Sequence, residues 1–219
     1  TEGEAPHRDL APLGVNLLGA APDGGGIIQE IPHILKEEGV LDGLCGKIKL
    51  CIVPAEELIE TGFRETVTSG YMEEKFRELG YNDLVLADGI TGFYTVIDTG
   101  RPGPEVLVLG ELDSIICPGH PDADPVTGAV HSCGHNAQCA ALLGVAAALK
   151  EPGVIDNMCG KIKLCAVPAE ELLEIEFRTG LKKEGKIKYL GGKSEFLSRG
   201  YFDGVDIAFM AHTTQGEQF

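Results

Sequence analysis

A continuous run of apolar residues, Val106 to Leu109, most constrains how this chain of 219 residues can fold. A strand that is apolar at every position has both faces covered, which is the environment of a parallel sheet between helices. The run leads directly into Gly110-Glu-Leu-Asp113, so carboxylates follow its carboxyl end. Functional side chains of open α/β sheets gather outside those strand ends. The sequence therefore predicts an α/β domain with a site near Asp113.

The rest of the chain alternates strand and helix patterns, as this fold class requires. Amphipathic or Ala- and Leu-rich stretches predict helices over 65–79, 137–149 and 194–199. Short apolar stretches predict strands over 84–87, 92–98, 105–109, 161–167 and 205–210. We therefore expect a mainly parallel sheet flanked by helices.

Composition narrows the classes of function. A formal net charge of -16 argues against partners such as nucleic acid or an anionic membrane, because both are bound through basic patches. We also expect no membrane span, because no apolar run is long enough, and no signal peptide at the acidic N-terminus. The seven cysteines form no CxxC pair, which is typical of free thiols in a reducing cytoplasm.

Two short motifs carry the chemistry: His131-Ser-Cys-Gly-His-Asn136 and Pro168-Ala-Glu-Glu171. Gly134 separates Cys133 from His135, and we expect a turn before the helix at 137 in which both side chains reach one centre. Thiolate, imidazole and carboxylate together suit Zn²⁺, with Mn²⁺ or Co²⁺ as alternatives. Of the adjacent Glu170 and Glu171, one can bind metal while the other takes a proton.

Simpler interpretations exist for each motif taken alone. An isolated cysteine is usually a small core residue, and a Glu-Glu pair is usually a solvated surface. The regular order of these motifs at the ends of predicted elements favours a metal site instead. A cysteine hydrolase using Cys133 with His135 is a third interpretation, but their two-residue spacing suits chelation better than a nucleophile beside its base.

The motifs resemble those of the M20 metallopeptidase family, in particular its amidohydrolase branch, which includes aminoacylase-like and p-aminobenzoyl-glutamate hydrolase-like enzymes. The resemblance extends from about Gly62 to Thr214. The matching runs are Gly110–Ser114, His131–Asn136, Pro168–Glu171, Tyr189–Lys193 and Asp206–His212. It implies a zinc-peptidase-like catalytic domain, of which residues 62–219 correspond to the first half.

The resemblance also implies roles for individual residues. Cys133, His135, Glu171 and His212 are similar to the family's metal ligands. Glu170 is similar to its general base, and Asp113 resembles the residue that orients a group of the site.

The implied reaction is hydrolysis of the amide bond of N-acyl amino acids or small dipeptide-like amides. One or two divalent ions would activate water, and Glu170 would remove its proton and return it to the leaving amine. The resemblance further implies a homodimer, which family members often form through their lid domains.

The order of segments departs from the family pattern. Residues 1–61 combine a piece similar to the family's lid, which is otherwise largely missing, with a duplicated strand segment. Residues 39–64 repeat residues 153–178 at 19 of 26 positions, so Pro-Ala-Glu-Glu recurs at 54–57, where we expect Glu56 and Glu57 to be bystanders. An engineered or permuted chimera, a rearranged gene and misassigned repeats remain open explanations. The alternative function is accordingly a truncated or chimeric, non-catalytic metal-binding fragment.

Overall fold

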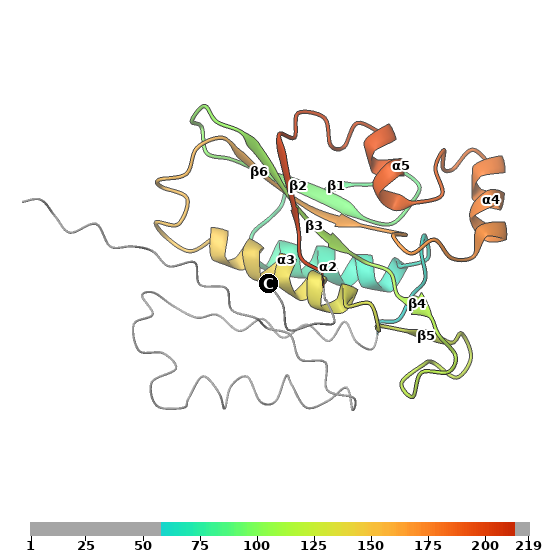
Figure 1. Cartoon of the computed structure of the whole chain (residues 1–219). Coiled ribbons are helices and arrows are strands. Elements are labelled where there is room, and N and C mark those ends of the chain that lie inside the picture. Colours follow the sequence, from blue (N-terminus) through green and yellow to red (C-terminus); the bar gives the residue numbers. More distant parts are fainter. Residues whose placement is uncertain (1–57, 213–219) are drawn as a thin grey trace, which may run out of the picture. The chain divides into compact units, whose positions relative to one another are not determined.

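A computed structural model describes residues 58–212, which belong to one compact unit, Cys45–Phe219 (Figure 1). The first Pro-Ala-Glu-Glu copy and the lid-like piece lie outside the described residues. The helices are α2 (Thr66–Glu78), α3 (His135–Leu149), α4 (Ile175–Lys183) and α5 (Gly192–Ser198). The strands are β1 (Val85–Leu86), β2 (Phe93–Asp98), β3 (Glu105–Glu111), β4 (Ile115–Ile116), β5 (Ala129–Val130), β6 (Lys161–Val167) and β7 (Ile207–Met210).

Five strands form a mixed sheet in the order β1-β2-β6-β3-β7. The half made of β6, β3 and β7 is parallel, and β2 and β1 join it antiparallel. The strands β4 and β5 form a separate two-stranded hairpin. The predicted α/β class is confirmed, and its parallel part contains the strand Glu105–Glu111, as its apolar run indicates.

Helices cover both faces of this sheet, and the alternation along β6 shows why. Leu164 and Ala166 are buried on the face that packs against α2 and α3, while Cys165 and Val167 are buried with Phe196 of α5 on the other. Figure 1 shows α2 and α3 side by side under the sheet and α5 on the opposite side. Because both faces are covered, the functional side chains are restricted to the ends of the strands.

Most of the predicted elements are confirmed within one or two residues. One boundary that differs, the start of α3, bears on the candidate motif. The helix α3 begins at His135 itself, two residues earlier than predicted, with Gly134 at φ 93° as its N-cap. Only glycine adopts this backbone easily, so the Cys-Gly-His motif ends in a tight entry to the helix. The helix α4 and the β4–β5 hairpin were not predicted.

The ends of the two sequence repeats contact each other reciprocally. The Arg64 guanidinium lies 3.9 Å from the ring centroid of Phe177, and that of Arg178 lies 5.6 Å from the ring centroid of Phe63. These are equivalent positions of the two copies. The same region is tied by Thr61 Oγ1, which donates to Glu174 Oε2 at 2.6 Å. Thr61, which the sequence analysis assigns to the first segment, thus contacts the part of the chain that is predicted to be the catalytic domain.

None of the helices within 58–212 is long and apolar enough to cross a bilayer. Disulfide bonds are absent among the cysteines of the same residues, namely Cys117, Cys133, Cys139, Cys159 and Cys165. This agrees with the expectation of cysteines that form no disulfides.

Candidate functional site

The candidate site forms where β3 and β6 end side by side. These strands are parallel, and Glu111 at the end of one is paired with Val167 at the end of the other. Asp113 follows the first strand, and Glu170 with Glu171 follows the second. The N-terminus of α3 brings His135 to the same edge. Three segments far apart in the sequence therefore converge at one edge of the sheet.

His135 is the centre of this cluster and is buried. Its Nδ1 donates to the backbone oxygen of Asp113 at 2.7 Å, and its Nε2 lies 3.0 Å from Glu111 Oε2. The same Nε2 is 3.7 Å from Glu170 Oε2 and 3.9 Å from Glu171 Oε1. Burial disfavours a charged imidazole, but hydrogen bonds to Asp113 and Glu111 outweigh it and raise the pKa of His135 to about 10. The surroundings of Nε2 favour a positive charge.

Cys133 and His212 complete a group with the donors of a metal site. Cys133 Sγ lies 3.5 Å from Nε2 of His212, which follows β7. Ligand atoms of Cys133, His135 and His212 lie within 4.8 Å of one another. Thiolate and imidazole donors at this spacing fit a Zn²⁺-type ion, and Glu171, hydrogen-bonded to the thiol, adds a carboxylate. The structure thus brings together the four residues that the sequence proposes as ligands.

The surroundings of Cys133 bear on the cysteine-hydrolase alternative. Burial, a hydrogen bond to Glu171 and the charges of Glu170 and Glu111 raise the pKa of its thiol to about 12. A nucleophilic cysteine needs the opposite environment, with positive groups that lower the pKa. The acidic surroundings of this thiol therefore favour chelation over nucleophilic attack.

Asp113 has the position expected of an orienting residue. Its side chain is fully buried, and its Oδ1 is 3.3 Å from His135 Nδ1. Its Oδ2 accepts the backbone N–H of Glu171 at 2.9 Å. One carboxylate thus contacts both the imidazole and the backbone of the Glu-Glu pair. The backbone oxygen of the same residue accepts the His135 Nδ1–H, and a histidine bonded in this way is held in one tautomer and orientation.

Glu111, Lys193 and Gln138 are polar residues of the site that were not predicted. Lys193 Nζ lies 2.5 Å from Glu111 Oε1 and 3.2 Å from Glu170 Oε1, while Gln138 Nε2 donates to Glu111 Oε2 at 2.9 Å. Burial alone would raise the pKa of Glu111, but contacts with His135, Lys193 and Gln138 lower it to about 2. The signal for Glu111 was available, because it lies in the run Gly110-Glu-Leu-Asp113 just after the predicted strand, where functional side chains of α/β sheets gather.

Lys193→Met tests how much the ion pairs of Lys193 with Glu111 and Glu170 stabilise the fold. Removing one partner of a buried ion pair costs about 3–5 kcal/mol, but Lys193 is 36% exposed, so we expect the free energy of unfolding to fall by about 2 kcal/mol. Urea denaturation of the metal-free protein measures it. Lys186→Met is the matched control, because the Lys186–Glu184 ion pair is more than half exposed. Equal losses in the two variants would contradict this role for Lys193.

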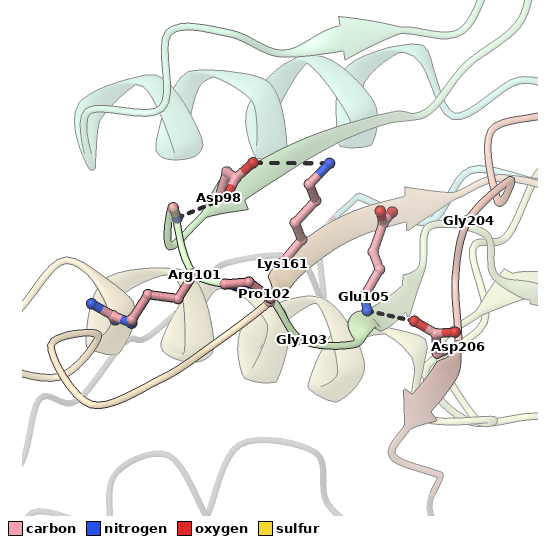
Figure 2. Close-up of a pocket in the computed structure, with 10 residues that line it drawn as sticks. Asp98, Arg101, Pro102, Gly103, Glu105, Lys161, Gly204 and Asp206 are labelled. Carbon is pink, nitrogen blue, oxygen red and sulfur yellow. Dashed lines mark hydrogen bonds and ion pairs between the residues drawn. The ribbon is translucent and has the colours of Figure 1, made fainter.

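A second polar feature lies where β3 and β6 begin, at the end of these strands away from the candidate site (Figure 2). It is a hollow of about 410 Å³. Its charged groups contact one another, with Asp98 Oδ2 3.9 Å from Lys161 Nζ and Asp206 Oδ2 accepting the backbone N–H of Glu105 at 2.8 Å. These contacts connect strand ends and a loop, and they bring together none of the predicted site residues.

Comparison with known proteins identifies hydrolases that the chain resembles. No family model matches the sequence. Indole-3-acetyl-aspartic acid hydrolase of Enterobacter agglomerans is 32% identical over 123 residues, which cover 50% of this chain and 28% of that protein. N-acetyl-L-cysteine deacetylase of Bacillus subtilis is 31% identical over 125 residues, which cover 56% of this chain and 26% of that protein. The chain therefore spans less than a third of the length of these two relatives.

Among solved structures, the chain is similar to Bacillus subtilis YXEP, described as a dinuclear metal binding peptidase from the M20 family. The TM-score is 0.57 at 22% identity, over 73% of this chain and 40% of that one. At this identity the likeness concerns the fold, and the sequence relatives add that the matching proteins are hydrolases. The chain is thus similar in sequence to amidohydrolases and in fold to part of a peptidase of the M20 family.

Proposed function

We propose that this chain is the metal-binding part of an amidohydrolase that cleaves N-acyl amino acids or small dipeptide-like amides. The observation that carries the proposal is the convergence of Cys133, His135 and His212 within 4.8 Å, with Glu170 beside them. The two curated relatives support the substrate class, because their names specify an acylated aspartate and an acetylated cysteine.

The donor set fits a divalent ion. Cys133, His135, Glu171 and His212 would hold it, and thiolate with imidazole favours Zn²⁺ over Mn²⁺ or Co²⁺. Ligand atoms of a second group, Glu111, His135 and Glu170, also lie within 4.8 Å of one another. The proposal therefore includes either one or two bound ions. When bound, a divalent ion lowers the pKa of water and polarises a carbonyl group.

The residues of the chain supply the proton transfers. Glu170 lies next to the proposed ligands, and its side chain is 32% exposed, so water and substrate can reach it. As general base it accepts a proton from water, and as general acid it returns the proton to the nitrogen of the leaving amine. Lys193, 3.2 Å from Glu170 Oε1, restrains the carboxylate in the site. The backbone oxygen of Asp113 holds the His135 ring by accepting its Nδ1–H at 2.7 Å.

The proposal is tested by metal content and hydrolysis measured together. We expect the purified chain to bind about one or two Zn²⁺ per molecule by elemental mass spectrometry, and to release amino acid from indole-3-acetyl-aspartate or N-acetylcysteine. Cys133→Ser should lose most of the metal and the activity. Cys117→Ser should retain both, because Cys117 is a free thiol that belongs to neither candidate metal group.

The outcomes separate two functions. Bound metal without hydrolysis of any N-acyl amino acid would favour the alternative, a non-catalytic metal-binding fragment. The observation behind that alternative is the short span of the chain relative to its relatives. Equal metal content in Cys133→Ser and Cys117→Ser would contradict the proposed ligand set itself. Assembly into a homodimer and a cytoplasmic location stay predictions.

A further inference from the structure

The backbone that carries the Glu-Glu pair has an uncommon conformation. β6 ends at Val167, and Ala169, the residue before Glu170, has a φ of 53°. A residue with a Cβ seldom adopts this left-handed backbone unless its surroundings hold it there. A return of φ to negative values at Ala169 would rotate the following backbone and re-aim both glutamates. The groups that hold Ala169 therefore bear on the geometry of the site.

One of these groups is the carboxylate of Glu65. This residue immediately precedes α2, 104 residues before Ala169, and it is completely buried. Its Oε1 accepts the backbone N–H of Ala169 at 2.7 Å, and its Oε2 accepts the hydroxyl of Thr91 at 2.7 Å. A buried carboxylate that bonds a backbone N–H in another segment joins the start of α2 to the loop after β6. Within residues 58–212, the Glu65 carboxylate is hydrogen-bonded to Thr91 and Ala169, and neither is a proposed metal ligand.

The other side of the same loop is held by Arg178, which is also fully buried. Its Nη1 donates to the backbone oxygens of Ala169 at 3.3 Å and Leu190 at 2.9 Å, and its Nη2 donates to the backbone oxygen of Glu171. The carbonyls before and after Glu170 are thus bound to one guanidinium. Glu65 supplies the bond to the N–H of Ala169, where the left-handed turn begins.

We propose that Glu65 is a positioning residue, whose hydrogen bond to the Ala169 N–H keeps the turn left-handed and so directs Glu170 and Glu171 into the site. The proposal rests on the proposed function for its catalytic consequence. It also has a consequence that is independent of catalysis, because Glu171 is one of the proposed metal ligands. Outer groups that orient metal ligands typically contribute 10–100-fold to metal affinity or activity.

Three variants test this role. Glu65→Ala removes the acceptor, while Glu65→Gln keeps an oxygen for the Ala169 N–H and can donate its amide to Thr91. Glu60→Ala is the matched control, because the Glu60 carboxylate accepts hydrogen bonds from backbone N–H groups of the same helix start, at Val67 and Thr68. Within residues 58–212, this carboxylate forms no hydrogen bond with the loop after β6. Each variant is titrated with Co²⁺ by absorption, assayed for kcat and KM, and unfolded thermally.

We expect Glu65→Ala to weaken Co²⁺ binding by about 10–100-fold and to lower kcat by a similar factor, with KM changed less than about threefold. Glu65→Gln should restore both to within about threefold of the parent chain. Glu60→Ala should lower the unfolding temperature and leave Co²⁺ affinity and kcat unchanged. Should Glu65→Ala not fold, Thr91→Val is the replacement variant, with Co²⁺ affinity expected to fall by about 2–5-fold through loss of the second bond to the carboxylate.

Two results would overturn the positioning role: Glu65→Ala no worse than Glu60→Ala in Co²⁺ affinity, or Glu65→Gln as impaired as Glu65→Ala. Parent-level Co²⁺ binding by Thr91→Val, where it replaces Glu65→Ala, would do the same. Failure of the proposed function has a different signature, in which the parent chain binds Co²⁺ but hydrolyses nothing. The Co²⁺ titrations then still decide the role of Glu65.

Discussion

Glu170→Gln should lower kcat for an N-acyl amino acid by about 10²–10⁴-fold while the metal content stays that of the parent chain. The amide of glutamine has the size of the carboxylate but cannot accept a proton from water at neutral pH. Metal should remain because the proposed ligand set, Cys133, His135, Glu171 and His212, is untouched. Steady-state kinetics and elemental mass spectrometry on the same preparation measure both quantities.

The control for this variant is Glu176→Gln, an exposed carboxylate in the first turn of α4. It changes the net charge equally and should leave kcat unchanged. If Glu170→Gln kept more than a tenth of the parent kcat, the general base would be another group. If it lost its metal as well, Glu170 would have to be counted among the ligands, in the group that it forms with Glu111 and His135.

The second large effect is a dependence of stability on pH that originates at Glu65. Burial, opposed by hydrogen bonds to Thr91 and Ala169, raises the pKa of this carboxyl group to about 7. The unfolded chain releases the same proton near pH 4.5, so between these two values the folded state holds a proton that the unfolded state has lost. Stability therefore falls as the pH rises through this window, by about 3 kcal/mol for a difference of this size.

Urea denaturation of the metal-free chain from pH 4.5 to pH 8 measures this effect against Glu65→Gln, which has no proton to lose. We expect the stability of the parent relative to Glu65→Gln to decrease steadily across the range. Glu60→Gln removes a partly exposed carboxylate from the same helix start and should show no comparable trend against the parent. A constant difference between the parent and Glu65→Gln would mean that Glu65 titrates alike in both states.

The parts of the fold that were predictable are those with a strong local pattern. The strand Lys161–Val167 has the predicted bounds, and the apolar run of β3 indicated the parallel part of the sheet. The antiparallel direction of β2 was not predictable, because strand direction depends on long-range pairing, which periodicity does not encode. The helix α4 escaped prediction because it begins after Glu174 in a left-handed conformation, without a side-chain cap.

The candidate site divides in the same way. Short sequence motifs contain Cys133, His135, Glu170 and Glu171, so metal-binding chemistry could be predicted for them without knowing how they are arranged in space. Glu111 and Lys193 are 82 residues apart, and nothing local to either residue indicates that the two will contact each other. Glu65 and Arg178 look like ordinary surface charges in the sequence, yet both are completely buried. Their partners, which are Thr91 and backbone groups of other segments, are not indicated by the residues beside them in the sequence.

The reciprocal contacts between the repeat ends have a practical consequence for shortening this chain. Phe63 and Arg64 pack against Arg178 and Phe177, and Arg178 is the residue that binds the carbonyls on either side of Glu170. The last residues of the first repeat are therefore not dispensable, because they pack against the last residues of the second repeat. A deletion intended to remove the duplication has to stop before Leu58, whose carbonyl oxygen lies 3.1 Å from His131 Nε2.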